Sequence, residues 1–345
     1  MDSALSAPMP VYFYLPRDAK WDDVLPTSMA DYWPWVTAQS RAGWWGKFNW
    51  TLQTALRLQD AGVPCEIART MPDRGIIIAH RSLLDSALRP GPEQLFVCQL
   101  ADRNPSGRSG QHPFAQIHVV QNPTDPWVVT PTPLWPAFHV PQWPQPGLRP
   151  RDAARGAAFE HAAFFGYAIN QAPDLNDDAW REQLRRRGLD WRVPSRDQWH
   201  DYTDTDVVVA ARAWDGGDYH HKPPSKLFNC WHAGVPAILG PESAYRAVRQ
   251  SPLDYLEVHS VEDALAALDR LRDDPQLRRD MVEHGRRRAR EVGAESLVTR
   301  WTTLIHDELK PAAARWAREG GWARARFIAR RRWSQFRAGR PEQKA

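Results

Sequence analysis

The sequence predicts an α/β protein with two Rossmann-like domains built on parallel sheets, followed by a basic helical tail. Its 345 residues are more than one ordinary core holds. Short β-branched runs alternate with helical patterns, as βαβ units require. Prolines crowd residues 123–150 and separate two such series. We therefore expect a first domain over 1–140, a linker over 141–158, a second domain over 159–310 and a tail over 311–345.

The first domain is predicted from short, continuous apolar runs, which are typical of parallel strands buried on both faces. One helix is expected over Phe48–Ala61, which Gly62 ends. We read the proline-rich stretch after the last strand as an extended crossing, because prolines exclude a regular helix or a central strand there. The expected strands are Val11–Leu15, Cys65–Ala68, Ile76–Ala79, Leu95–Leu100 and Ile117–Val120.

The second domain shows a clearer alternation of strands and helices, which predicts a doubly wound sheet. Ligands of such sheets bind beyond the carboxyl ends of the strands. The expected strands are Ala162–Tyr167, Asp206–Ala211, Val235–Leu239 and Tyr255–Val258. The expected helices are Asp177–Arg187, Ser225–Ala233, Ser243–Arg249, Val261–Arg272, Pro275–Glu291 and a long one from Glu295.

Composition limits the classes of protein. Hydrophobic residues make up 42% and charged residues 25%, as in globular proteins. No apolar run approaches the ~18 residues of a spanning helix, and Met1–Ala4 lacks the features of a secretory signal. The three cysteines, Cys65, Cys98 and Cys230, lie in apolar stretches without a CxxC pattern, which favours reduced thiols over disulfides or a metal site. We expect a cytoplasmic protein.

The segment that carries chemistry follows the strand Asp206–Ala211. Arg212 stands at the end of this strand, and after a polar loop Ser225 and Lys226 open a helix that stops at Gly234. Ser225 is the expected cap. A lysine in the first turn opposes the helix dipole unless an anion such as phosphate lies between them. Arg212 is placed to grip the same anion.

A purely structural interpretation of the same residues stays open. In it, Lys226 is exposed to solvent, and Arg212 pairs with Asp204 or Asp215.

The run from Pro224 to Pro236, Pro-Ser-Lys-Leu-Phe-Asn-Cys-Trp-His-Ala-Gly-Val-Pro, resembles the donor-site segment of GT-B glycosyltransferases. The order of elements from about Ala162 to Leu304 resembles their C-terminal domain. The resemblance implies that Ser225 and Lys226 hold the donor's diphosphate and that Asn229 binds the ribose.

The sequence also departs from that family. Gly166 stands at the glycine turn of the donor site, but Tyr167-Ala168-Ile169-Asn170 replaces the expected Arg and Lys. Many family 4 members carry two glutamates eight positions apart, where this chain has His221 and Asn229.

The implied activity is transfer of a hexose from a nucleotide-diphosphate-sugar co-substrate to a glycan or lipid-linked acceptor, as in polysaccharide biosynthesis. Lys226 and Arg212 would stabilise the leaving diphosphate. We expect no cofactor and no metal, because no DxD-type motif ends a strand; Asp204 and Asp206 precede one.

Further site residues are predicted by position. His80 and Asp102 follow two first-domain strands, and each is either the catalytic base or an ordinary turn residue. Glu242 and Ser243 open the helix after Val235–Leu239 and either hold donor hydroxyls or cap that helix.

The tail is electrostatically distinct, with ten Arg or Lys and two Glu from Pro311 onward. Arginines and aromatic residues interleave over 322–337, which predicts either a basic amphipathic helix on an anionic membrane or a solvated tail. Nucleic acid is not an expected partner, because the rest of the chain is not basic. Two other functions stay open: a non-catalytic nucleotide- or sugar-binding protein, and a nucleotide-sugar epimerase.

Overall fold

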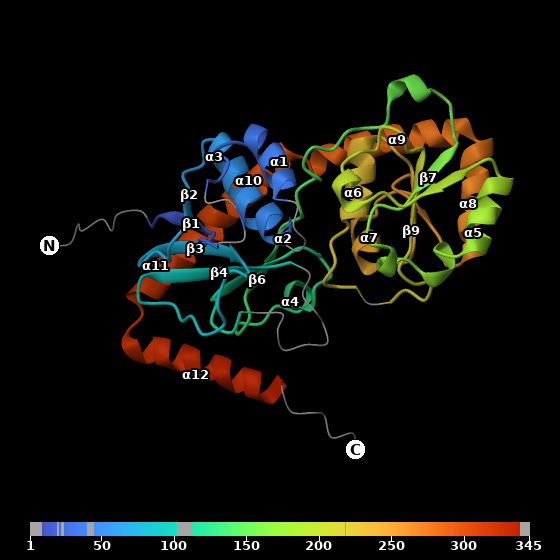
Figure 1. Cartoon of the computed structure of the whole chain (residues 1–345). Helices are drawn as coiled ribbons and strands as arrows, with labels where there is room; N and C mark the ends of the chain where they lie inside the picture. The colour runs from blue at the N-terminus through green and yellow to red at the C-terminus, as the bar shows by residue number, and fades with distance from the viewer. Residues whose placement is uncertain are drawn as a thin grey trace, which may run out of the picture. The chain divides into compact units, whose positions relative to one another are not determined.

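The computed structural model describes residues 9–18, 21, 24–39, 45–101, 112–217 and 219–338, without the side chains of residues 45 and 336–338. The chain forms two compact units. Unit 1 comprises Met1–Pro141 and Leu297–Ala345, and unit 2 comprises Gln142–Ser296. Each unit holds one sheet, and the strand pairs of the described residues are all parallel. The predicted α/β class with two parallel sheets is therefore confirmed (Figure 1).

The sheet of unit 1 has the strand order β2-β1-β3-β4-β5-β6. Residues of β3 and β5 are buried along their whole length, as their continuous apolar runs predict. The strands are β1 Val11–Tyr14, β2 Glu66–Ala68, β3 Gly75–His80, β4 Gln94–Leu100, β5 Ile117–Val120 and β6 Ala137–His139.

The proline-rich segment is not purely extended, so that prediction was wrong. Asp125 caps a short helix, α4 (Pro126–Val129), by accepting from the Trp127 N–H. Pro126 fits the first turn of this helix, where no N–H is needed. The segment then adds β6 to the sheet as an edge strand, a position that tolerates prolines nearby.

The predicted helix over 48–61 begins as a π-helical turn, η1 (Phe48–Leu52), and continues as α3 (Gln53–Asp60). A helix that the sequence did not predict is α1 (Met29–Ala38), which contains Pro34 and is capped by Ser28. A short α2 (Trp45–Lys47) precedes η1.

The C-terminal segment returns to unit 1. The long helix expected from Glu295 is α10 (Ala294–Thr303), followed by a π-helical η6 (Leu304–Leu309) and α11 (Lys310–Arg318). Trp301 is fully buried and lies edge-on to Phe13 of β1, with ring centroids 6.3 Å apart. Trp316 donates from Nε1 to the Gly91 carbonyl at 2.8 Å. The tail forms a separate helix, α12 (Gly321–Ala338).

The sheet of unit 2 has the strand order β11-β10-β9-β7-β8. Its strands are β7 His161–Ala163, β8 Asp190–Arg192, β9 Val207–Ala210, β10 Ala237–Leu239 and β11 Leu256–Glu257. The strand β8 was not predicted; it is a three-residue edge strand with a charged residue at each end. The helices are α5 Asp178–Arg186, α6 Ser225–Ala233, α7 Ser243–Val248, α8 Val261–Asp273 and α9 Pro275–Glu291. Short 3-10 turns are η2 Ala153–Arg155, η3 Ala168–Asn170, η4 Pro173–Leu175 and η5 Arg196–Gln198.

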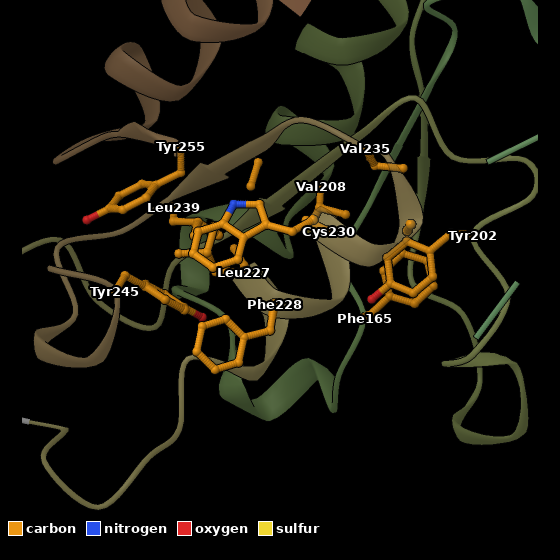
Figure 2. Packing of buried hydrophobic residues seen from close by; sticks show 14 of the residues in the cluster. Phe165, Tyr202, Val208, Leu227, Phe228, Cys230, Val235, Leu239, Tyr245 and Tyr255 are labelled. Atoms are coloured by element: carbon orange, nitrogen blue, oxygen red, sulfur yellow. The ribbon is translucent and has the colours of Figure 1, made fainter. Parts of the chain in front are cut away.

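Two apolar clusters form the core of unit 2. One of them packs α6 against the sheet through Leu227, Phe228, Cys230 and Trp231 (Figure 2). The other contains Trp180 of α5 and Leu268 of α8. This packing fixes α6, and with it the position of its first turn.

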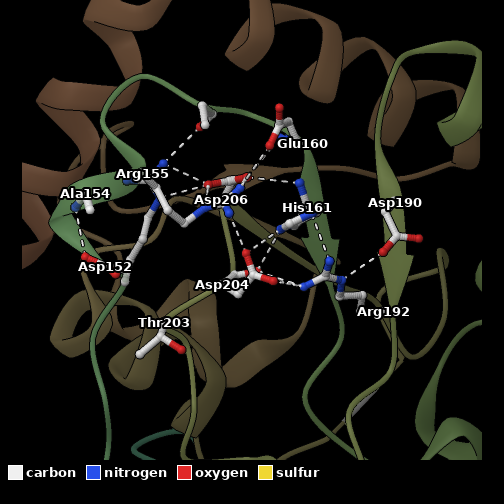
Figure 3. A network of polar contacts seen from close by, with 12 residues as sticks. Asp152, Ala154, Arg155, Glu160, His161, Asp190, Arg192, Thr203, Asp204 and Asp206 are labelled. Carbon is white, nitrogen blue, oxygen red and sulfur yellow. Dashed lines mark hydrogen bonds and ion pairs between the residues drawn. The ribbon is translucent and has the colours of Figure 1, made fainter.

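An ion network lies at the amino ends of β7, β8 and β9 (Figure 3). The carboxylate of Asp206 accepts from Arg155 Nη2 at 2.7 Å and from the backbone N–H groups of Glu160 and His161 at 2.8 and 3.0 Å. Burial raises the pKa of Asp206, but these bonds and one from Arg151 lower it to about 2. The Asp206 carboxylate is therefore bound within the protein, at the end of the sheet away from the carboxyl ends of the strands.

The described helices include none that is both long and apolar enough to cross a bilayer.

Candidate functional site

The site centres on the first turn of α6, beyond the carboxyl end of β9. Pro224 occupies the N-cap position with φ −77°, and no side chain caps the helix. The prediction that Ser225 is the cap was wrong, because Ser225 is already the first helical residue. Gly234 ends the helix in the left-handed conformation at φ 67°, as the sequence predicts. The uncapped first turn therefore presents backbone N–H groups and the positive end of the helix dipole.

Lys226 points from this turn toward the loop after β7. Its Nζ lies 5.0 Å from the centroid of the Phe164 ring. It also lies 3.4 Å from the position that a Cβ on Gly166 would occupy. The close contact that the missing side chain of Gly166 avoids is with the Phe164 ring, at 2.9 Å from Cε1.

The ammonium of Lys226 has no hydrogen bond or ion pair with any residue that the structure describes. Its pKa falls from 10.5 to about 8, chiefly because of burial and also because of the positive charges of Arg212 and Lys222, while Glu242 raises it. A bound anion would offset the free-energy cost of keeping this buried lysine charged, because an opposite charge favours the protonated form.

Arg212 forms the second cationic group of the site. Its Nε lies 3.2 Å from Glu242 Oε2, and the Glu242 side chain is only 4% exposed. The guanidinium lies over the ring of Tyr219, 5.6 Å from the centroid. The alternative that Arg212 pairs with Asp204 or Asp215 was wrong. Within the described chain, the two Nη groups of Arg212 have no hydrogen-bond acceptor, so they can bind an anion.

Glu242 and Ser243 open α7, as predicted. Glu242 is the N-cap residue, but its side chain accepts from Arg212 instead of from the first backbone N–H groups of the helix. The hydroxyl of Ser243 is buried and has no hydrogen-bond partner in the described part of the chain.

Asn229 lies on α6, one turn after Lys226. Its Oδ1 accepts from the backbone N–H of Gln145 at 3.1 Å. Burial raises the pKa of the nearby Tyr202 hydroxyl well above its usual value. Asn229 therefore holds the segment that leads into unit 2, and its ribose-binding role stays a prediction.

The two candidate bases belong to unit 1. His80 ends β3, is 8% exposed and has its Nδ1 2.7 Å from Ser82 Oγ. Its backbone N–H donates to Thr51 Oγ1 of η1 at 2.9 Å, which fixes the strand end. Asp102 lies outside the described residues.

Carboxylates, imidazoles and thiols do not gather in groups of three that could hold a metal ion, as far as the structure describes the chain.

Phe164, Tyr219 and the bond between Arg212 and Glu242 are parts of the site that the sequence did not predict. Phe164 lies two residues before Gly166, so the glycine was a usable signal for a close approach. No local sequence pattern indicates the pairing of Arg212 with Glu242, because the two residues are thirty positions apart.

Neither protein-family models nor the sequences of curated proteins match this chain. Among solved structures it is similar to TarM of S. aureus, with 10% identity and a TM-score of 0.50 over 73% of this chain and 58% of TarM. It is also similar to the pneumococcal O-GlcNAc transferase GtfA in complex with UDP and GlcNAc. The identity is 10% and the TM-score 0.50, over 75% of this chain and 60% of GtfA.

The chain has the GT-B fold. The fold predicted from the α6 segment is thus confirmed. In GT-B terms, unit 2 is the domain in which the sequence analysis placed the donor. The chain spans less than two thirds of the length of these neighbours, and identity of this order shows the fold alone.

Proposed function

We propose that this GT-B protein is a glycosyltransferase that moves a hexose from a nucleotide-diphosphate sugar to a glycan or lipid-linked acceptor. The observation that carries the proposal is the ammonium of Lys226, which lies at the start of α6 and has no hydrogen bond or ion pair with the described residues. A diphosphate supplies the missing negative charge to Lys226, to the free Nη groups of Arg212 and to the first backbone N–H groups of the helix.

The same groups serve catalysis. Breaking the sugar–phosphate bond leaves negative charge on the departing diphosphate and positive charge on the anomeric carbon. Cations placed where the negative charge develops stabilise the transition state more than the ground state. Losing one such donor typically costs ~3 kcal/mol. We propose that Lys226 and Arg212 act in this way without a metal ion.

The remaining roles complete the proposal. Gly166 admits the diphosphate beside Lys226, Ser225 donates to a phosphate, and Asn229 contacts the ribose. Ser243 has an unused buried hydroxyl that suits a donor hydroxyl, and Glu242 contributes by orienting Arg212.

We propose His80 or Asp102 as the base that activates the acceptor.

We also propose peripheral contact of residues 322–337 with the cytoplasmic face of the inner membrane. Trp322 and Trp333 of α12 are 91% and 58% exposed. They lie about three helical turns apart and hence on one side of the helix. Arg326 and Arg330 are exposed on the same helix. Tryptophan suits the interface, and each basic residue adds ~1 kcal/mol on an anionic surface. Such contact would bring the enzyme to a lipid-linked acceptor.

A donor screen followed by product analysis tests the function. UDP and UDP-sugars are the first compounds, because the GtfA structure contains UDP and GlcNAc. At a hundredfold excess over Kd, a true donor adds ~2.7 kcal/mol of stability. We expect sugar release or transfer in the wild type and in Lys310→Ala, and a loss of at least a hundredfold in Lys226→Ala.

The other outcomes identify the alternatives. Binding without turnover indicates a non-catalytic nucleotide- or sugar-binding protein, and an epimerised donor without acceptor indicates an epimerase. If no nucleotide binds, or if Lys226→Ala binds and turns over normally, the proposal fails.

A further inference from the structure

A large groove lies within unit 1 and is lined by residues of α12, α11 and the strands β4 to β6. Its volume is about 1210 Å³. Small-molecule pockets typically measure ~300–1,000 Å³, so the groove has room for a long chain. Its apolar walls include Leu95, Ile117, Leu134, Phe138, Trp316 and Phe327. Walls of this kind suit hydrocarbon.

One charged residue of the groove is unusual. Arg331 of α12 has no exposed surface, and its guanidinium lies 3.8 Å from the centroid of the Trp135 ring. The ring centroid of Phe327 lies 4.9 Å from the same guanidinium. None of the nitrogens Nε, Nη1 and Nη2 has a hydrogen-bond partner in the described part of the chain. Contact with aromatic rings offsets only part of the cost of burying a charge.

No acceptor of the described residues bonds the guanidinium of Arg331. The nearby His118 is also fully buried, and its Nδ1 has no hydrogen-bond partner among the described residues. Glu308 and Glu319 line the groove, but neither bonds the guanidinium. The Nε and both Nη groups of Arg331 are therefore buried donors without an acceptor among the described residues.

We propose that this groove binds an amphiphile with a hydrocarbon chain and a phosphate head, and that the phosphate pairs with Arg331. The guanidinium fork matches phosphate oxygens in bidentate geometry. The lining carries four arginines and two glutamates. This excess of two positive charges matches a phosphate monoester, which carries up to two negative charges. The site is built from unit 1 alone and goes beyond the proposed sugar transfer, on which it does not depend.

Binding of dodecyl phosphate below its micelle concentration tests the proposal, measured by calorimetry on the full chain. We expect saturable binding that weakens at least tenfold in Arg331→Met and stays unchanged in Arg332→Met. Arg332 is the matched control, because it is an exposed neighbour on the same helix. Inorganic phosphate and dodecyl maltoside supply the head alone and the tail alone, and each is expected to bind at least tenfold more weakly.

A second variant keeps the test independent of the folding of Arg331→Met. Ala312→Phe places a larger side chain on the α11 wall of the groove. It should also weaken the binding of dodecyl phosphate at least tenfold. UDP affinity, measured on the same samples, should not change, so failure of the groove and failure of the nucleotide site are distinguishable. Equal binding of dodecyl phosphate by the wild type and both groove variants would overturn the proposal. So would equal affinity for inorganic phosphate or for dodecyl maltoside.

Discussion

Replacing Lys226 by methionine should stabilise the ligand-free protein and weaken nucleotide binding at the same time. The pKa of Lys226 falls from 10.5 to about 8, chiefly by burial. Each pKa unit corresponds to ~1.4 kcal/mol, so the charged form costs ~3 kcal/mol at most. Because the side chain is partly exposed, we expect about half of this, a rise of a few degrees in Tm.

The effect on UDP has the opposite sign. A hydrogen bond to a charged group contributes ~1.5–3 kcal/mol, so Lys226→Met should weaken UDP binding by ~10- to 100-fold. Wild-type affinity should also fall as pH rises through about 8, where the free lysine loses its proton. The methionine variant should not show this fall.

Stability follows the same titration. Between pH 8 and 10.5 the unfolded chain binds more protons at this lysine than the folded chain does. The wild type therefore gains unfolding free energy across this window, and its deficit relative to Lys226→Met closes.

Thermal unfolding and calorimetric UDP titration at pH 6.5 and 9.5 measure both effects, with Lys310→Met as the control. A methionine variant that binds UDP as tightly as the wild type would show that the Lys226 ammonium does not bind the diphosphate. A variant that unfolds at a lower temperature without ligand would refute the assigned cost of the charge.

Three further substitutions probe the second unit. Gly166→Ala puts a Cβ 2.9 Å from Cε1 of the buried Phe164 ring, which must shift, so calorimetry should show weaker UDP binding and urea unfolding should show lower stability. Arg212→Met leaves buried Glu242 without its cation and should cost ~3–5 kcal/mol in urea unfolding, most of it restored by adding Glu242→Gln. Asp206→Asn should lower the free energy of unfolding by ~2 kcal/mol at pH 7. The wild type loses the same contribution as pH falls from 3.8 to about 2, because the folded pKa is the lower one, and pH-dependent urea unfolding would show no such step in the variant. Equal pH profiles would contradict this assignment.

The sequence predicts elements well where one signal dominates. Continuous apolar runs such as Ile76–Ala79 reappear in β3, and the punctuation by Pro224 and Gly234 bounds α6. It fails where tertiary contacts decide. The helix α1 forms despite Pro34, and a proline-rich stretch supplies the edge strand β6.

The site divides in the same way. The position of Lys226 beyond a strand end can be predicted from the sequence, because the residues that start and end a helix and the order of the strands are local signals. Its neighbour Phe164 and the Glu242 partner of Arg212 come from other strand ends, so only the folded sheet brings them together.

The return of the C-terminus to unit 1 sets an order for folding on the ribosome. Trp301, whose ring contacts Phe13, leaves the exit tunnel after all of unit 2 has been made. The sheet that is synthesised first must therefore wait, with an apolar surface uncovered, for the residues that are synthesised last. A premature stop near residue 296 would leave unit 2 complete and unit 1 without its closing helices.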